Sequence, residues 1–242
     1  MRLFKVRFFL PLSLDKRLTF IPMKLSIFSI LFYLSSFTLA NSIPPGAFSI
    51  TRIHYSGGGD WYADPSSLPN LLQYIKNETN IVVNPLEQRA KIGDDIFLSN
   101  GYFYLTGHGN IKFSNEEAQI LRDQLLAGAF LHADDNYGMD KSFRKLIKLL
   151  FPEKELIEIP PSHDIFQCYY KFENGLPKIH EHDNKPPQAL GVFEEEKLIL
   201  LYTYESDLGD GWEDKNVHNV PDEKRLSALK MGTNIIIHAL TR

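Results

Sequence analysis

Asp134, Asp135, Asn136 and Tyr137 stand together directly after the strand-like residues 130–133. Carboxylate and amide groups supply negative charge and paired hydrogen bonds, so this stretch can ligate a hard cation or hold sugar hydroxyls. The alternative is structural, with Asp134 accepting backbone amides in a tight turn and Asp135 facing water. We expect Asp134 and Asp135 to be catalytic and Asn136 and Tyr137 to contact a ligand.

A second polar stretch, residues 106–109, places His108 between Gly107 and Gly109. Glycine allows a ligand to approach the backbone closely, and an imidazole can act as a base or a ligand. A histidine beside a carboxylate can serve as general acid and base. We therefore predict that His108 is catalytic and that Gly107 binds a ligand, with an ordinary turn histidine as the alternative.

His180, His182 and Asp183 have the chemistry of metal ligands. Side chains at positions i and i+2 of an extended segment point the same way, so both imidazoles can reach one ion. No HExxH or CxxC pattern accompanies them, and a hydrogen-bonded loop is the alternative interpretation. A divalent metal is the one cofactor that the sequence suggests, and its identity stays open.

Two further loops combine glycine, tryptophan and acidic residues. A tryptophan in such a loop suits stacking on a sugar ring, although buried packing is its more frequent role. The spacing of Asp207, Asp210 and Asp214 departs from that of an EF-hand calcium loop. The residues of these loops that we predict to contact a ligand are Gly58, Gly59, Asp60, Trp61, Asp207, Asp210 and Trp212.

Nucleophilic catalysis by a thiol or by the serine of a GxSxG motif is disfavoured. The single cysteine, Cys168, lies in an irregular aromatic stretch, and no GxSxG motif is present. We expect Cys168 to be a half-buried structural thiol.

Strand-like and helix-like segments alternate through the first part of the chain. β-Branched and aromatic residues predict strands at residues 47–55, 80–83, 102–105 and 130–133. Apolar spacing predicts a helix with N-cap Ser67, one with the capping box Ser114 and Glu117, and one with N-cap Asp140. This alternation implies a parallel sheet, and in such a sheet the strand-to-helix loops converge at the carboxyl edge, where open α/β folds bind ligands.

The second part of the chain is less regular. Residues 191–204 predict a pair of strands with a turn at residues 194–196. Residues 221–241 predict a closing helix whose apolar face carries Leu226, Leu229, Ile236 and Leu240. We expect one α/β domain over residues 41–242.

Residues 1–40 have the pattern of an N-terminal extension and a secretory signal. Lys24 precedes an almost wholly apolar run, and Thr38, Leu39 and Ala40 resemble a small-x-small cleavage site. Met23 is a second candidate start, and an uncleaved anchor is the alternative, although the run of about 15 residues is short for the roughly 20 that span a bilayer. We therefore expect an exported protein, periplasmic or secreted, with no stable membrane span after cleavage.

The charge of the remaining chain argues against a nucleic-acid partner. The whole chain holds 26 basic and 30 acidic residues, of which six basic and one acidic lie in residues 1–40, so residues 41–242 carry a net charge of −9. One cysteine cannot form an internal disulfide, so an exported chain of this kind depends on its core for stability.

Five motifs in order resemble the bacterial family known as domain of unknown function 4159. They are HYSGGGDWYADPSSLPNLL, YLTGHGNIKFS, FLHADDNYGMDKSFR, GLPKIHEHD and TYESDLGDGWED, and the resemblance covers about residues 48–242. It implies a flavodoxin-like three-layer sandwich with a mainly parallel sheet, related to the class I glutamine amidotransferase-like group that includes the trehalose-utilisation proteins. The role of the family is undetermined, so the resemblance implies a fold and no reaction.

The same resemblance implies that glutamine hydrolysis is lost. Amidotransferases carry a cysteine on the turn that corresponds to residues 131–135, and this chain has none there. Trehalose-utilisation proteins carry a histidine at the end of this strand, which His132 matches. Residues 162–165 resemble their His-Pro-Ile segment, with Asp164 in place of proline.

Two functions from different classes remain open. The first is an exported protein that binds a small polar, carbohydrate-like ligand at the carboxyl edge, with hydrolase or isomerase activity that needs no cysteine nucleophile. The second is a non-enzymatic envelope module whose tryptophan- and aspartate-rich loops contact another protein. Metal binding by His180, His182 and an aspartate of the edge is compatible with both.

Overall fold

The computed structural model describes residues 44–242. The predicted extension and signal segment, residues 1–40, with the alternative start at Met23, lies outside the described residues. The described part clusters as one unit, Pro44–Arg242. No helix in this part is both long enough and apolar enough to cross a membrane.

Seven strands of the described residues form one sheet in the order β2-β1-β3-β4-β7-β6-β5. Their bounds are β1 (Thr51–Ile53), β2 (Gln88–Ala90), β3 (Tyr102–Gly107), β4 (Phe130–Asp135), β5 (Ile157–Glu158), β6 (Gln188–Glu194) and β7 (Lys197–Tyr204). β2, β1, β3, β4 and β7 run parallel, whereas β6 is antiparallel to both β7 and β5. The prediction of an α/β fold with a mainly parallel sheet is confirmed, as is the strand pair that ends at Tyr204.

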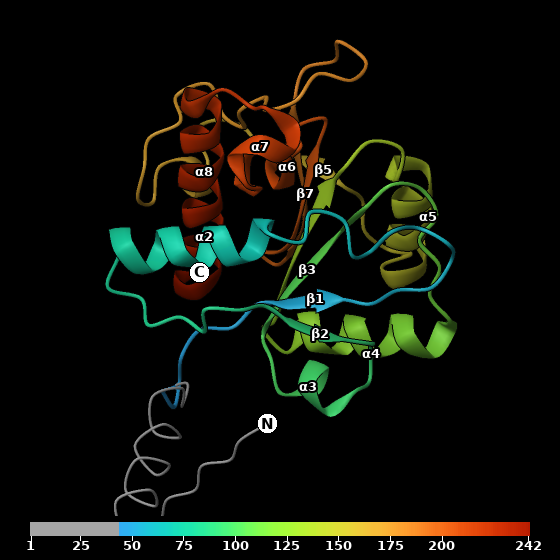
Figure 1. The fold of residues 1–242 in the computed structure, drawn as a ribbon. Helices are drawn as coiled ribbons and strands as arrows, with labels where there is room; N and C mark the ends of the chain where they lie inside the picture. The colour runs from blue at the N-terminus through green and yellow to red at the C-terminus, as the bar shows by residue number, and fades with distance from the viewer. Residues whose placement is uncertain (1–43) are drawn as a thin grey trace, which may run out of the picture. The chain divides into compact units, whose positions relative to one another are not determined.

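Helices cover both faces of this sheet (Figure 1). The helices are α2 (Ser67–Glu78), α3 (Asp95–Leu98), α4 (Asn115–Leu126), α5 (Asp140–Leu150), η1 (Asp164–Phe166), α6 (Leu208–Trp212), α7 (Lys215–His218) and α8 (Asp222–Thr241). Apolar residues of α4 and α5 form one hydrophobic cluster, and those of α2, α6 and α8 form the other. The sheet is thus buried on both sides.

The central strands supply both clusters because successive side chains of a strand point to opposite faces. Every residue of β3 and of β4 is buried. Phe103 and Leu105 belong to the cluster under α4 and α5, whereas Tyr102 and Tyr104 belong to the cluster under α2 and α8. This alternation decides on which side of the sheet each polar side chain at the strand ends emerges.

The strand predicted at residues 80–83 is wrong. Within it only Val83 makes a bridge, to Phe48, and the second strand of the sheet is β2 at residues 88–90. β2 lies at the edge of the sheet and pairs only with β1. An edge strand does not need apolar side chains on both faces, so the polar sequence Gln-Arg-Ala gives no strand signal.

The helix predicted at residues 221–241 is confirmed, but its predicted buried face is correct only in part, since Ile236 is buried and Leu229 packs against the core. Leu226 and Leu240 are 44% and 52% exposed. The buried side of α8 includes the small residues Ala228 and Gly232, and a Cβ added at Gly211 of α6 would lie 2.4 Å from the Cβ of Ala228. Helices that pack this closely require small residues at their contact. A search for periodically spaced large apolar residues does not detect such positions.

The predicted helix caps are correct at one of three positions. Ser114 and Glu117 form the expected capping box at the start of α4. Ser67 and Asp140 are the first residues of α2 and α5 rather than their caps. At the start of α2 the carboxylate of Glu213 accepts hydrogen bonds from the backbone N–H groups of Ser66 and Ser67, at 2.7 and 3.1 Å. A residue about 150 positions away therefore satisfies this helix end, where a negative charge also suits the helix dipole.

The orientation of α8 can be tested with a pair of truncations. Ile236→Ala removes a side chain that is fully buried and should lower the free energy of unfolding by about 2–5 kcal/mol. Leu240→Ala, on the exposed side of the same helix, should change it by about 0.5 kcal/mol or less. Urea denaturation followed by circular dichroism measures both, and equal losses would contradict the packing described here.

Candidate functional site

The loops that follow β1, β3 and β4 meet at the carboxyl edge of the sheet. Oδ1 of Asp60 accepts a hydrogen bond from the backbone N–H of His108, and Oδ2 of Asp60 lies 2.9 Å from Nδ1 of His108. The Asn136 amide donates a hydrogen bond to the carboxylate of Asp64. The predicted convergence of these loops is therefore confirmed.

The adjacent carboxylates Asp134 and Asp135 point to opposite sides of the sheet, as successive residues of β4 must. Asp134 reaches the side of α6, where it accepts the backbone N–H of Gly209. Asp135 reaches the side of α5, where it accepts the backbone N–H of Met139. Both are buried. The two carboxylates predicted as catalytic therefore do not converge on one point.

Asp134 ties together three elements. Its Oδ1 accepts the hydroxyl of Thr203 at the end of β7 and the backbone N–H of Leu208, and its Oδ2 accepts the N–H of Gly209 at 2.7 Å. Burial raises the pKa of Asp134 to about 7, although these hydrogen bonds act in the opposite direction. Burial likewise raises the pKa of Asp135 to about 6. Asp134 fixes where the chain leaves β7, which is the segment that carries Asp207 and Asp210.

Arg52, a fully buried residue of β1, holds the loop that carries Asp64. Its guanidinium donates to the backbone oxygens of Ala63 and Asp64, at 2.7 and 3.2 Å. Asp64 has a left-handed backbone with φ of 54° and is 7% exposed. The guanidinium thus orients the Asp64 backbone, while the side chain of Asp64 stays directed toward Asn136.

His180, His182 and Asp207 form the first of two groups whose ligand atoms converge within 4.8 Å of one another. Oδ2 of Asp207 lies 2.8 Å from Nε2 of His182 and 3.8 Å from Nδ1 of His180. Asp207 is 2% exposed, and among the described residues its Oδ1 has no hydrogen-bond partner. The two histidines that the sequence singled out are therefore brought together with a buried aspartate.

The sequence predicted a different third ligand. Asp183 lies outside this group, where it accepts the hydroxyl of Tyr137 at 2.9 Å and pairs with Lys185 at 3.0 Å. The ring of Tyr137 stacks on that of His182, with centroids 4.6 Å apart. Asp183 and Tyr137 thus pack beside His182, and the carboxylate that faces both imidazoles is that of Asp207.

Asp64, Asp210 and His218 form the second group. Asp210 lies on α6, and its Oδ2 is 2.6 Å from Nδ1 of His180, a member of the first group. The two groups are therefore adjacent. Both converge where the loop after β1 meets the segment after β7.

The groups contain an excess of buried negative charge. Burial is the main cause that raises the pKa of Asp207 well above its ordinary value, and the charges of Asp210, Asp134 and Asp64 add to the effect. The pKa of Asp64 is also raised, first by burial and then by Asp210 and Glu213, although its bond from Asn136 opposes this. Burial is the main cause that lowers the pKa of His182. Each of these pKa shifts disfavours the charged form of its side chain in the folded protein. A bound cation would reverse that preference at the carboxylates.

His108, which is exposed, and Asp60, which is half-buried, form a hydrogen-bonded pair on the same edge. Partial burial acts to raise the pKa of Asp60, but hydrogen bonds from the backbone and ring of His108 more than offset it, so the pKa lies below its ordinary value. The contact at Nδ1 orients the imidazole and leaves its Nε2 available. Gly107 permits the arrangement, because its φ is 135° and an added Cβ would lie 2.3 Å from the hydroxyl of Tyr55.

The residues of the glycine loop and the two tryptophans differ in their exposure and in their contacts. Gly59 donates its N–H to the backbone oxygen of Asn110, which fixes the loop, and Gly58 is exposed. Trp61 is half-buried, and its ring stacks on His54. Trp212 is fully buried and donates its indole N–H to the backbone oxygen of Ala228. The prediction that Trp212 contacts a ligand is wrong, because α6 turns this side chain into the core under α8.

Cys168 and His163, which the sequence analysis also considered, make their contacts outside the two groups. Cys168 is half-buried, its thiol donates to the backbone oxygen of Asn234, and burial raises its pKa to about 11. This agrees with the predicted structural thiol. His163, of the segment resembling His-Pro-Ile, accepts the backbone N–H of Ile165 and lies beside His238 rather than beside either group.

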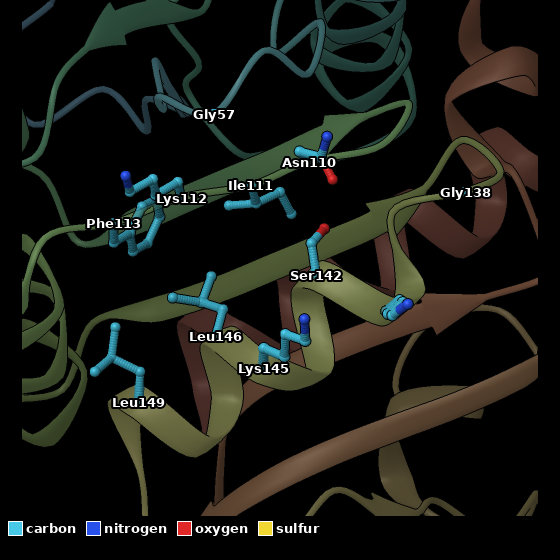
Figure 2. Close-up of a pocket in the computed structure, with 11 residues that line it drawn as sticks. Gly57, Asn110, Ile111, Lys112, Phe113, Gly138, Ser142, Lys145, Leu146 and Leu149 are labelled. Carbon is cyan, nitrogen blue, oxygen red and sulfur yellow. The ribbon is translucent and has the colours of Figure 1, made fainter.

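A cavity of about 580 Å³ lies between α5 and residues 110–113 (Figure 2). Ile111, Phe113 and Leu146 form its apolar part. Three lysines but no acidic residue are among its lining residues, Gly57, Asn110, Ile111, Lys112, Phe113, Gly138, Lys141, Ser142, Lys145, Leu146 and Leu149. None of the predicted site residues is among these lining residues, so the cavity is separate from the two ligand groups.

Sequence inspection missed several residues of the site, above all Asp64 and His218. Asp64 precedes a proline in a motif that was noted, but a single aspartate of a turn carries no signal of its own. His218 stands alone in the stretch Asn-Val-His-Asn. Only the packing of α6 and α7 brings these side chains within 3.6 Å of each other, measured between Oδ1 of Asp64 and Nε2 of His218.

Comparison with protein-family models gives one match. Residues 49–240 match the family described as a domain of unknown function, DUF4159. A search of the curated proteins finds no match.

The state of His132 can be tested by its titration. His132 is buried beside Thr203, and burial lowers its pKa to about 3. The folded protein therefore binds fewer protons at this ring than the unfolded chain below about pH 6.5, and stability is lost as the pH falls from that value toward 3. We expect the ring resonances of His132, assigned through His132→Gln, to stay constant between pH 5 and 8 in NMR spectra. A midpoint above pH 5 would contradict the burial and make His132 a candidate acid or base.

Proposed function

The chain belongs to the family described as a domain of unknown function, DUF4159, and we propose that it is a metal-dependent hydrolase. Its metal ligands are His180, His182 and Asp207, at the carboxyl edge of the sheet. The substrate is a polar molecule, and the carbohydrate-like ligand suggested by the sequence is the first class to examine.

One observation carries the proposal: two imidazole nitrogens and a buried carboxylate converge, and the carboxylate has a free oxygen. Asp207 is 2% exposed, and its Oδ1 has no partner among the described residues. A buried polar atom without a partner costs free energy, so its presence calls for an explanation such as an ion. His182 is hydrogen-bonded to this carboxylate through Nε2, and Nδ1 of His180, which is hydrogen-bonded to Asp210, lies 3.8 Å from it.

The ligand set favours zinc or a similar divalent ion of the first transition series. Imidazole nitrogens suit such ions, whereas magnesium and calcium prefer all-oxygen sites. Catalytic zinc sites commonly take two histidines and one carboxylate, which leaves a fourth position for water or substrate. His180 is 44% exposed at its side chain, so solvent can reach this side of the group.

A cation at this position would lower the pKa of a bound water and polarise a carbonyl or phosphoryl oxygen. The protein supplies orientation and proton transfer. Asp207 is held by the backbone of the segment after β7, which Asp134 anchors. In this proposal His108, oriented by Asp60, serves as general acid and base on the same edge.

The finer assignment of fold and location belongs to the same proposal. The mainly parallel sheet with helices on both faces supports a flavodoxin-like class related to glutamine amidotransferases. The absence of cysteine from residues 131–135 supports a chemistry different from theirs. The signal-like residues 1–40 support export to the periplasm or the medium.

The proposal can be tested with a pair of variants at neighbouring positions. Titration calorimetry of the metal-free protein with zinc chloride should detect binding, and His182→Ala should weaken it by more than about 100-fold, because a direct ligand is lost. Asp183→Ala should leave the affinity unchanged, because Asp183 faces Tyr137 and Lys185 instead.

Activity provides the second readout. Hydrolysis of p-nitrophenyl acetate and p-nitrophenyl phosphate should require added zinc or manganese and should be lost in His182→Ala. If zinc does not bind the wild-type protein, or binds His182→Ala equally well, the proposed site is wrong.

A further inference from the structure

Asp64, Asp210 and His218 have the geometry of a second cation site. Nε2 of His218 lies 3.2 Å from Oδ1 of Asp210 and 3.6 Å from Oδ1 of Asp64. In a tetrahedral site with metal–ligand bonds of about 2.1 Å, ligand atoms are separated by about 3.4 Å. Both distances are close to that value.

These contacts are not hydrogen bonds. Nε2 of His218 is inaccessible to solvent and has no hydrogen-bond partner among the described residues, even though two carboxylate oxygens lie close to it. A ring nitrogen that donated a proton to either oxygen would be aligned with it. The three ligand atoms instead lie within 4.8 Å of one another, close enough to bind one ion.

Asp210 connects this group to the first one. Its Oδ1 faces His218, whereas its Oδ2 lies 2.6 Å from Nδ1 of His180. Asp210 is 4% exposed, so its orientation is fixed by the surrounding protein. A carboxylate whose two oxygens face two separate ligand groups has the geometry of a bridging ligand.

We propose that the protein binds a second divalent cation at Asp64, Asp210 and His218, and that Asp210 bridges it to the first cation in a two-metal centre. This inference rests on the proposed function, because the first cation is the one held by His180, His182 and Asp207. In two-metal hydrolases the ions lie about 3.5–4 Å apart and stabilise both the attacking and the leaving oxygen.

The charges around the site agree with two cations. Asp64, Asp134, Asp207 and Asp210 are all buried within this edge of the sheet. The basic side chains that face them are the imidazoles of His180, His182 and His218, while the Arg52 guanidinium donates hydrogen bonds to backbone oxygens of residues 63 and 64. Several carboxylates in so small a buried volume repel each other, and divalent ions offset that repulsion directly.

Metal stoichiometry tests the inference on the full chain. We expect the wild-type protein, saturated with zinc and then freed of excess, to retain two ions per chain by elemental analysis. His218→Ala should retain one ion and should remain folded, since the side chain of His218 is 29% exposed on the short helix α7. His218→Gln serves if the alanine variant does not fold. His108→Ala, a histidine of the same edge outside both groups, is the matched control and should retain two.

Electron paramagnetic resonance of the manganese-loaded protein provides an independent readout. Two bridged Mn²⁺ ions should give an exchange-coupled spectrum in the wild type and in His108→Ala, and a spectrum of isolated ions in His218→Ala. One ion in both the wild type and His218→Ala would overturn the second site while leaving the first in place. No bound ion in the wild type would overturn the proposed function itself.

Discussion

The carboxylate of Asp134 is the interaction on which the functional edge depends. It stands at the end of β4, where Thr203 of β7 and the first backbone N–H groups of α6 all donate hydrogen bonds to it. β4 and β7 are neighbours in the sheet, so one side chain joins two strand ends to the start of a helix. Because Asp207 and Asp210 lie on either side of the contact at Leu208 and Gly209, the positions of both depend on Asp134.

Arg52 has a comparable role in the loop after β1, on the opposite side of the site. A guanidinium that is fully buried must find hydrogen-bond acceptors, and Arg52 finds them in the backbone oxygens of the loop that ends at Asp64. Glu213 then satisfies the start of α2 just after that loop. Side-chain contacts with the backbone, rather than regular secondary structure, thus fix the irregular segments that carry the candidate ligands. Replacement of any one of these buried groups would leave the hydrogen-bonding groups of its partners unsatisfied, which costs free energy. These hydrogen bonds therefore restrain the loops that carry the candidate ligands.

The sequence predicts the part of this structure that arises from periodicity. β3, β4, α4, α5 and the β6–β7 hairpin follow from alternating or helical spacing, and the carboxyl edge follows from the order of strands and helices. His180 and His182 could be predicted as metal ligands because their spacing is local. Asp64 and His218 could not be found in this way, since they lie 154 positions apart and meet only through α6 and α7. Trp212 and part of the buried face of α8 were misjudged for a related reason, because close packing between small residues leaves no periodic pattern.

The burial of the acidic residues supports the proposed metal site over the docking surface that the sequence left open. A docking surface needs exposed aromatic anchors, and Trp212, one of the two tryptophans expected to serve as such, lies in the core. Nor does docking require carboxylates withdrawn from water, since burial raises their pKa and lowers stability when they are ionised. A metal site requires both features: carboxylates with restricted positions, and imidazoles close enough to share an ion with them. Burial of Asp64, Asp207 and Asp210 beside three histidines thus lowers stability without benefit to a surface that only binds another protein. The same arrangement is appropriate for a surface that holds cations.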